Sequence, residues 1–432
     1  MANVIERVLS DSLRSHPGLR TFLRTIYLRT MYCAARATSF FNPPKSRFLP
    51  AAAVTEQNTQ CFFGYYDKCP WDRTGRYLLY VQVPFADRMP EPGEATTLGF
   101  IDLHNNNQSH TLGQTTAWCW QQGCMLQWLE GYSDLLVIHN DFQNGEYISV
   151  IRYLNGAVKK TLPLPIYAVS KDGKQTVSLN FGRLHYGCAG YGYVAKAYLD
   201  DDEPHPANDG IWHVDVETGE HKLIISLDQV IKYLPRETFK HSFHYFNHLE
   251  FNPSGTRFVF LHRWFVKQKG GVRGKQYTRM LTVNPDGTDI YCLADHGMVS
   301  HLAWKDDKHI LAWATHPSHG NRYYLFEDKT EKVHVVGDGI LTEDGHPSYS
   351  PDGRWLIADT YPNKARLRTL ILFDVSNPKR IDLGRYHAPF KFDGPWRCDL
   401  HPRWSRDGRK VCFDSIHEGT RRIYVVDVSS IL

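Results

Sequence analysis

A short motif recurs along the chain, and it constrains the fold more than any other feature of the sequence. Two copies share almost the same pattern, His346-Pro-Ser-Tyr-Ser-Pro-Asp-Gly353 and His401-Pro-Arg-Trp-Ser-Arg-Asp-Gly408. Four further copies in the same register have these residues at the turn: Gly75, Gly173, Gly255 and Lys308. A seventh, degenerate copy covers residues 126–138. A period of about 45–55 residues is typical of repeat architectures, in which neighbouring units bury each other's apolar faces.

Each copy has the pattern of two strands joined by a tight turn. Asp-Gly or Ser-Gly supplies the positive φ that a hairpin needs, and β-branched and aromatic residues flank the turn. A third strand follows in several copies, for example at 369–375 and 422–428. The spacing suits four-stranded blades. The sequence therefore predicts an all-β fold, a seven-bladed β-propeller of four-stranded blades with a short N-terminal α-helical segment.

Two further predictions concern the closure of the ring and a long gap between copies. The chain ends soon after a third strand, so we expect the segment Cys61–Phe63 to complete the last blade. The copies at Gly173 and Gly255 are unusually far apart, which indicates an insertion around residues 181–240. The alternative of two separate β-sandwiches fits the even repeat poorly.

Residues 1–48 form a basic leader that differs from the predicted propeller at 49–432. The leader has eight basic and two acidic side chains, a balance of +6, so the rest of a chain with net charge +4 sums to −2. Its apolar residues follow helical spacing and arginines flank them: Leu19, Phe22, Leu23, Ile26 and Tyr27, with Arg20, Arg24 and Arg29. A basic amphipathic helix can lie on an anionic membrane or pack against the propeller, and both readings stay open. Asn42-Pro43-Pro44 marks the predicted boundary.

Charge and cysteine content narrow the class of protein. A propeller with a small negative charge is not expected to bind nucleic acid. The nine cysteines are odd in number and form no CxxC pair, which favours free thiols in a reducing compartment. Neither a signal-peptide pattern nor an apolar run of membrane-spanning length is present in the sequence. We therefore expect a monomeric cytoplasmic protein, with peripheral contact to the inner membrane face through residues 1–48 as an open possibility.

The register of the repeat places histidines at one position of several blades. Seven residues before the turn residue are Lys68, Ile166, His248, His301, His346 and His401. Since the first strand of each blade lines the central channel, these side chains are expected to form a ring. Neutral imidazole is a common metal ligand, and Asp399, two residues before His401, can add a carboxylate from the same side of the strand. The alternative is histidines that hydrogen-bond between strands and bind no metal.

A second polar position lies seven residues after the turn, at the end of the second strand. It is occupied by Gln82, Asn180, His262, Thr315, Thr360 and Ser415. Because the hairpin doubles back, this ring is expected at the same mouth as the histidines. Aromatic rings stack on sugars and arginine forks onto carboxylates, which favours a sugar acid as ligand. The predicted substrate-binding residues are Lys68, Tyr65, Tyr66, Asn180 and Tyr361.

Motifs of other enzyme classes are missing from the sequence. It has no nucleophile elbow, no P-loop, no dinucleotide-binding glycine pattern and no HExxH. Acidic pairs of the kind that hydrolyse glycosides are not prominent at the ring positions.

The His-Pro-x-aromatic-Ser-x-Asp-Gly blades, together with Phe260-Leu-His262-Arg263-Trp and Ser300-His301-Leu-Ala-Trp, resemble the oligogalacturonate lyase family of seven-bladed propellers and its TolB-like relatives. The likeness is best over residues 245–430. It implies a divalent metal, usually manganese, that grips the uronate carboxylate while a basic residue removes the C5 proton in a β-elimination.

The resemblance also implies roles for particular residues. His301 and His401 resemble two of the family's metal ligands, and His262 resembles an active-site histidine. Asp399 stands where the family has a further histidine, and Trp396 where it has a glutamine. The predicted metal ligands are His248, His301, His346, His401 and Asp399. The predicted catalytic residues are His262 and, as candidate bases, Arg263 and Arg183.

Two functions from different classes follow from these observations. The first is a metal-dependent lyase, or another carbohydrate-active enzyme, whose partner is an acidic oligosaccharide or polysaccharide. The second is a non-catalytic propeller that binds a glycan or a protein at a membrane surface, in polysaccharide assembly.

Overall fold

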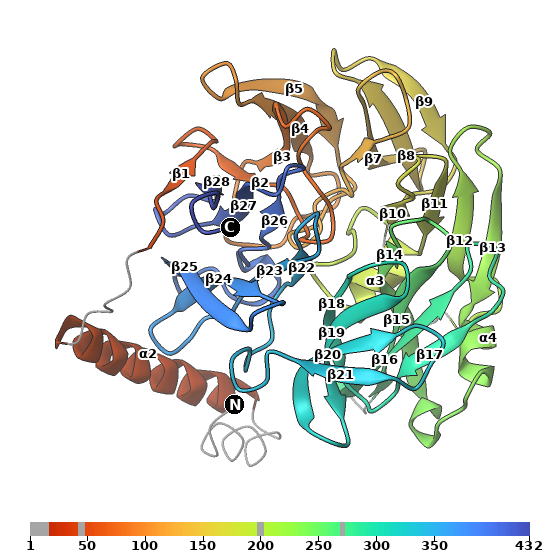
Figure 1. Cartoon of the computed structure of the whole chain (residues 1–432). Helices are drawn as coiled ribbons and strands as arrows, with labels where there is room; N and C mark the ends of the chain where they lie inside the picture. Colours follow the sequence, from red (N-terminus) through yellow and green to blue (C-terminus); the bar gives the residue numbers. More distant parts are fainter. Residues whose placement is uncertain (1–16, 42–47, 197–202, 268–272) are drawn as a thin grey trace.

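The computed structural model describes residues 17–41, 48–196, 203–267 and 273–432. Within these residues seven β-sheets, each with four antiparallel strands, are arranged around one central axis (Figure 1). This confirms the seven-bladed propeller, including the degenerate second blade and the N-terminal helix. The proposed boundary at Asn42-Pro43-Pro44 lies outside the described residues.

The blades follow each other in chain order, and the first strand of each lies nearest the axis (Figure 1). Blades one to three consist of β2 (Gln60–Phe62), β3 (Tyr77–Val83), β4 (Thr96–Asp102) and β5 (Gln108–Thr115); β6 (Gln127–Leu129), β7 (Leu136–Gln143), β8 (Glu146–Tyr153) and β9 (Val158–Leu162); and β10 (Ala168–Val169), β11 (Gln175–Ser178), β12 (Gly210–Asp215) and β13 (His221–Ser226). Blades four and five consist of β14 (Ser242–Phe251), β15 (Phe258–Lys267), β16 (Arg273–Val283) and β17 (Tyr291–Ala294); and β18 (Val299–Trp304), β19 (His309–His316), β20 (Gly320–Glu327) and β21 (Val333–Val336). Blades six and seven consist of β22 (Ser348–Tyr349), β23 (Trp355–Asp359), β24 (Leu367–Asp374) and β25 (Lys379–His387); and β26 (Arg403–Trp404), β27 (Lys410–Ser415), β28 (Arg422–Asp427) and β1 (Ala51–Ala53).

The repeated motif builds the turn between the first two strands. In blade six Gly353 has φ +71, the left-handed conformation that the sequence predicts there. The Ser350 hydroxyl donates to Asp352, and the same Ser350 oxygen accepts the backbone N–H of Trp355 at 2.9 Å. The motif therefore closes its own hairpin, which explains why it recurs with so little change.

The closure of the ring differs in one respect from the prediction. Strand β1 completes blade seven, with Ala51 opposite Val426 on β28. The segment Cys61–Phe63, which was expected in that place, instead contains the inner strand of blade one. Its Cys61 N–H does donate to the Arg421 carbonyl at 2.7 Å. The chain thus passes along blade seven before it enters blade one. Residues 51–53, rather than 61–63, form the strand that pairs with β28.

Tryptophans on the inner strands tie neighbouring blades together. The indole N–H of Trp304 donates to the Glu250 carbonyl of the preceding blade at 3.0 Å, and that of Trp404 donates to the Ser348 carbonyl at 3.1 Å. Both indoles are buried between blades. A large apolar side chain with one polar atom suits this position, because it fills the interface and still satisfies its N–H.

The helices lie outside or between the blades. Helix α2 (Pro17–Phe41) runs beside blade six (Figure 1), where Tyr32 contacts His387 and Phe390. The predicted insertion contains α3 (Phe181–Gly187), α4 (Leu227–Lys232) and the short helix Glu237–Phe239, although it also supplies the outer strands of blade three. No helix among the described residues has the length and apolarity needed to cross a membrane.

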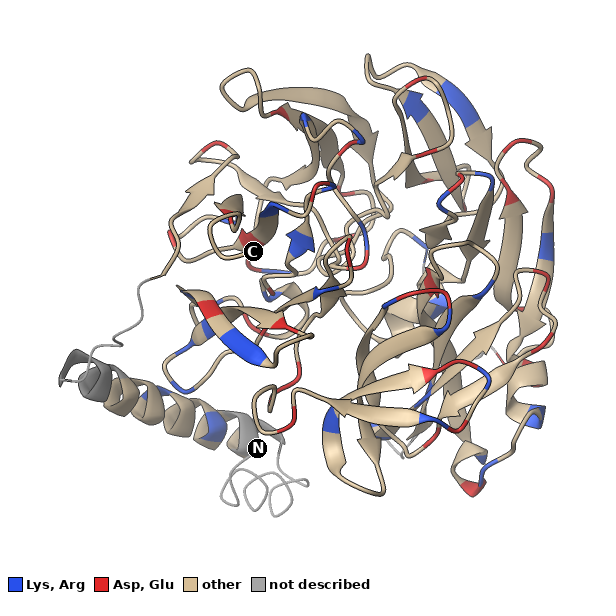
Figure 2. Ribbon diagram, in the orientation of Figure 1, with Lys and Arg blue, Asp and Glu red and all other residues tan. Residues whose placement is uncertain are grey.

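Charged residues of both signs are spread over the blades. Figure 2 shows lysine and arginine interspersed with aspartate and glutamate on most strands and loops. The nine cysteines are all free, which agrees with the absence of a disulfide framework.

Candidate metal centre

The four ring histidines meet at the axis, and the backbone is irregular at three of them. His248 has φ +54 and lies in a register shift between Asn247 and Glu250. His301 lies in a shift between Val299 and Leu302, and His401 has φ +43. Bulges and left-handed residues redirect a side chain out of the regular alternation of a strand. Such backbone geometry is costly for residues other than glycine and is concentrated at functional sites.

The imidazoles form a chain of close neighbours around the axis. Ring centroids are 6.0 Å apart for His248 and His301, 4.1 Å for His301 and His346, and 4.3 Å for His346 and His401. All four residues are buried. The four histidines are distant in sequence and lie together in the structure, as the register of the repeat predicts.

Each of three histidines is fixed through its Nδ1 atom. His301 Nδ1 lies 3.0 Å from Asp344, His346 Nδ1 lies 2.7 Å from Asp359, and His401 Nδ1 donates to the Gly64 carbonyl at 2.7 Å. A hydrogen bond from Nδ1 leaves the lone pair on Nε2, which is the arrangement that metal-binding histidines adopt.

Among the described residues, Nε2 of His346 and Nε2 of His401 are buried without a hydrogen-bond partner. Buried polar atoms are nearly always paired, so two such nitrogens in one place require an explanation. Burial, and then neighbouring His346, hold the pKa of His401 well below its usual range. His401 is therefore neutral near pH 7 and has a lone pair to offer.

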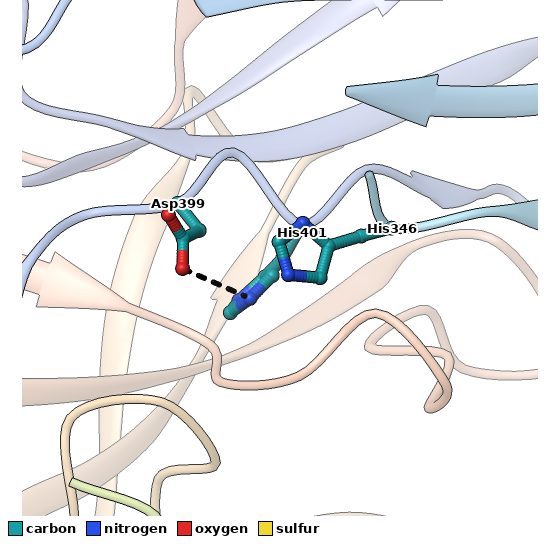
Figure 3. A group of neighbouring side chains, drawn as sticks. All are labelled: His346, Asp399 and His401. Carbon is teal, nitrogen blue, oxygen red and sulfur yellow. Dashed lines mark ion pairs between the residues drawn. The ribbon is translucent and has the colours of Figure 1, made fainter. Parts of the chain in front are cut away.

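Asp399 completes a group of three potential ligands (Figure 3). One ligand atom each from His346, Asp399 and His401 can lie within 4.8 Å of the others, and Asp399 Oδ2 is 3.9 Å from His401 Nε2. Burial disfavours the charge of Asp399, but the guanidinium groups of Arg368 and Arg397 hold its pKa well below the usual range. Arg368 contacts Oδ1 at 2.6 Å and Arg397 contacts Oδ2 at 2.7 Å.

Two tyrosines predicted to bind substrate pack against the histidines. The Tyr65 hydroxyl is 3.4 Å from His248 Nε2, and its ring is 4.9 Å from that of His401. The Tyr66 ring is 5.3 Å from His346, and its hydroxyl is fixed by both the N–H and the carbonyl of Leu302 at 2.9 Å. The segment 63–69 thus crosses the channel and forms one wall of the histidine site.

Tyr361 and Arg263 lie on other sides of the same site. Tyr361 is 37 % exposed and its ring is 5.9 Å from that of His346, so it lies on the solvent side of the cluster. Burial, and then the cationic Arg263, hold the pKa of His248 well below its usual range. Burial opposes the charge of Arg263 itself, but Tyr245 beside it raises its pKa. Arg263 therefore stays protonated, which does not favour its predicted role as a base.

His262, Arg183 and Asn180 are not part of this cluster. His262 lies within blade four, where it bonds His244 at 2.9 Å and accepts from Arg279 at 3.0 Å. Its strand β15 continues five residues past it to Lys267, so His262 lies in mid-strand rather than at the mouth.

Arg183 and Asn180 belong to helix α3 beside blade four. Arg183 donates to the His244 carbonyl at 2.7 Å and to the carbonyls of Glu203 and Pro204. Asn180 caps the helix by accepting the Arg183 N–H at 2.9 Å. Both residues therefore have structural bonds where α3 packs against β14, the inner strand of blade four.

Lys68 also departs from the predicted ring. Its Nζ pairs with Asp67 at 2.7 Å and lies 4.9 Å from the centre of the Tyr167 ring. The inner strand of blade one stops at Phe62, and the chain then crosses the channel. The register that aligns the histidines is lost there, so Lys68 faces the other side of the tyrosines.

The groups that hold the cluster in place are not among the residues predicted from the sequence. They are Gly64, Tyr191, Asp344, Asp359, Arg368 and Arg397. Only Asp359 had a signal, since both clear copies of the motif end in an aspartate, Asp359 and Asp414. In blade seven Asp414 pairs instead with Arg403 at 2.8 Å.

Comparison with known proteins supports the fold. No family model and no curated protein matches the chain. Among solved structures, an oligogalacturonate lyase from Vibrio parahaemolyticus is similar with a TM-score of 0.59 and 15% identity, covering 88% of this chain and 94% of that one. An oligogalacturonate lyase in complex with manganese has the same TM-score at 16% identity, covering 88% of this chain and 93% of that one. The chain shares the seven-bladed propeller fold of the oligogalacturonate lyases.

Proposed function

We propose that the chain is a carbohydrate-active enzyme, a metal-dependent lyase that cleaves uronate-containing oligosaccharides by β-elimination. One observation carries the proposal. Two buried histidines, His346 and His401, each have an anchored Nδ1 and an unpartnered Nε2, next to the buried carboxylate of Asp399.

The donor set fits a divalent metal. His346, His401 and Asp399 would hold it, with His301 and His248 next to them on the ring. Imidazole and carboxylate together suit first-row metals, and carboxylate favours manganese among them. A bound cation supplies a Lewis acid beside the uronate carboxylate, which stabilises the charge that develops there. The manganese complex of a similar propeller supports this choice of metal.

In this proposal an arginine beside Asp399 binds the anionic substrate. Arg368 and Arg397 both contact Asp399, and Arg397 also donates to the Tyr191 hydroxyl at 3.1 Å. The Arg397 side chain keeps 19% of its surface exposed, so it is the cation of the pair that a carboxylate can reach. Guanidinium groups bind carboxylates in a bidentate manner, and exposed Tyr361 offers an aromatic face to a sugar ring.

In this proposal two neighbouring groups, His248 and Tyr65, move protons. His248 is neutral and can accept the C5 proton, while the C4–O bond breaks and the C4–C5 double bond forms. Burial raises the pKa of Tyr65 well above its usual value, so this hydroxyl stays protonated and can donate to the departing oxygen. The two groups are 3.4 Å apart, so a proton can pass between them after the reaction.

Polyuronate cleavage in the presence of manganese tests the proposal. The metal-loaded chain is expected to convert oligogalacturonate or another polyuronate into an unsaturated product, measured by its ultraviolet absorbance. His401→Ala should abolish this product, whereas His262→Gln should retain it. A chain that binds metal at the cluster but cleaves no polyuronate would rule out the lyase.

A second candidate function rests on helix α2. Leu19, Phe22 and Ile26 are 49%, 61% and 47% exposed, and Arg24 and Arg29 are exposed on the same helix. An apolar face with flanking arginines favours a propeller that binds a glycan or protein at a membrane surface. The full chain should then float with phosphatidylserine vesicles, and a variant with serine at these three apolar positions should not. Equal flotation of both proteins would remove this candidate.

A further inference from the structure

The histidine cluster is almost completely enclosed. His248 is the most exposed of its four histidines, with 4% of its surface accessible, and Asp399 keeps 2%. A ligand of the size of a sugar residue therefore reaches the imidazoles only if part of the surrounding wall moves. Enzymes that enclose their reacting groups commonly use a loop for this purpose.

Two loops meet beside the cluster. One covers residues 188–193, which follow helix α3, and the other covers residues 389–397, which connect β25 to blade seven. A Cβ atom at Gly190 would lie 3.2 Å from the Cβ atom of Pro395, so the two loops are in close contact. They belong to different blades, three and seven, and touch only because the ring of blades is closed.

Arg397 bridges the two loops and the cluster. It donates to the Tyr191 hydroxyl of the other loop at 3.1 Å and to Asp399 Oδ2 at 2.7 Å. The Asp399 side chain has no exposed surface, whereas 19% of the Arg397 side chain is exposed. The guanidinium group therefore lies between the carboxylate and solvent.

The backbone of the loop 389–397 is not paired with any strand. Among the described residues its backbone–backbone hydrogen bonds are internal, from the Phe392 N–H to the Pro389 carbonyl and from the Arg397 N–H to the Gly394 carbonyl. Phe392 is the only buried residue of this loop. A segment with little buried apolar surface and no strand pairing opens at a lower free energy than the surrounding strands.

Side chains from neighbouring segments hold this loop closed. Gln121 Nε2 donates to the carbonyls of Pro395 and Arg397 at 3.0 and 3.1 Å. Arg421 donates to those of Trp396 and Arg397 at 2.8 and 3.2 Å. Opening of the loop therefore costs hydrogen bonds from side chains, but it breaks no sheet.

We propose that residues 389–397 form a lid over the histidine cluster, with Arg397 as its latch, and that the lid opens while the blades stay folded. The open state admits a ligand of the size of a sugar residue to the imidazoles. This role in substrate entry rests on the proposed lyase, whereas the opening itself is a property of the fold.

Cysteine labelling of the full chain tests the opening, without metal or polyuronate. Cys398 directly follows the lid and Cys412 lies on β27 inside blade seven, and both are buried. A buried thiol reacts with iodoacetamide only when its surroundings open. Peptide mass spectrometry should show that Cys398 is labelled at least tenfold faster than Cys412. Equal rates would mean that unfolding of the blade exposes both thiols, and the proposal would be wrong. Since no activity is measured, failure of the proposed lyase would not alter this result.

Two neighbouring glutamines provide a variant and its matched control. Gln121→Leu removes two hydrogen bonds to the lid and should speed the labelling of Cys398 relative to Cys412 about tenfold. Gln122 is also buried but donates to Tyr167, so Gln122→Leu should leave the ratio of the two rates unchanged. A general loss of stability speeds both thiols and cancels in this ratio. An unchanged ratio in Gln121→Leu, or an equal increase in both variants, would overturn the proposal.

Discussion

Two pairs of buried histidines in this propeller have opposite arrangements of hydrogen bonds. Around His262 the bonds form a complete chain, in which Arg279 donates to His262, His262 contacts His244, and His244 reaches the Phe239 carbonyl. His346 and His401 have bonds only at Nδ1 and keep Nε2 unpartnered. Both pairs are buried, so burial alone does not identify a ligand. The lone pair that the protein leaves unused distinguishes a binding site from an internal hydrogen-bond network.

The largest expected effect separates the two pairs by metal affinity. His346→Ala or His401→Ala should weaken manganese binding by roughly 100-fold or more, since a lost ligand exceeds the 10–100-fold cost of a lost outer partner. His262→Gln should leave the affinity unchanged. Calorimetric titration with manganese measures both. Equal losses of manganese affinity in the two pairs would show that the unpartnered Nε2 atoms do not mark a metal site.

The next effect concerns the group that holds the candidate ligands. Asp359 accepts from both the N–H and Nδ1 of His346, and its second oxygen accepts the N–H groups of Leu400 and His401. Asp359→Asn should weaken manganese binding about 10–100-fold, because the orientation of His346 and the backbone at His401 both loosen. Asp344→Asn, which affects only His301, is the matched control. An affinity equal to that of the unaltered chain would mean that Asp359 does not position the ligands.

The His262 pair should instead govern stability. His262→Leu removes the partner of Arg279 Nε and of His244 Nδ1 inside blade four, and the unfolding free energy should fall by about 2–4 kcal/mol. Chemical denaturation of the metal-free chain measures the change. His262→Gln is the matched control, and we expect it to cost less because its amide can keep a hydrogen bond to one of the two neighbours. An unfolding free energy unchanged by His262→Leu would contradict this structural role.

The last effect is a dependence of stability on pH. Burial lowers the pKa of His244 to about 3 and holds that of His262 well below its usual range. Below about pH 6.5 the unfolded chain binds protons that the folded chain does not. Stability should therefore fall as the pH drops from 6.5 towards 3, by up to about 1.4 kcal/mol per pH unit for each histidine. Replacing both residues with non-titrating amides should reduce this slope, although other buried histidines such as His139 and His248 still contribute to it. An unchanged slope would contradict the assignment.

Part of this site follows from the sequence because the repeat controls it directly. His346 and His401 belong to intact copies of the motif, so their register survives in the structure. Lys68 belongs to a copy whose inner strand ends early at Phe62, and a count of residues cannot reveal where a strand ends. His262 is displaced for the opposite reason, since its strand is longer than those of the neighbouring blades.

The groups that complete the site come from outside the motif. Arg368 lies on the third strand of blade six and Arg397 in the loop before blade seven, and both reach Asp399 only when two blades are packed together. Asp344 likewise lies in the connection between blades five and six. Contacts of this kind depend on the rotation between adjacent blades, which no local pattern encodes. The fold was therefore predictable in outline. The candidate ligands were easier to predict than the residues that hold them in place.

The pairing of β1 with β28 has a consequence for how the protein acquires its site during synthesis. Residues 51–53 leave the ribosome early, but their partner strand is made about 370 residues later, so this edge must wait unpaired for most of translation. The Gly64 carbonyl is also made early, and it has no contact with His401 until blade seven has been synthesised. The geometry of the candidate ligands is therefore complete only once blades one and seven are in contact. If they bind a metal as proposed, the chain should acquire its metal affinity only after the ring has closed.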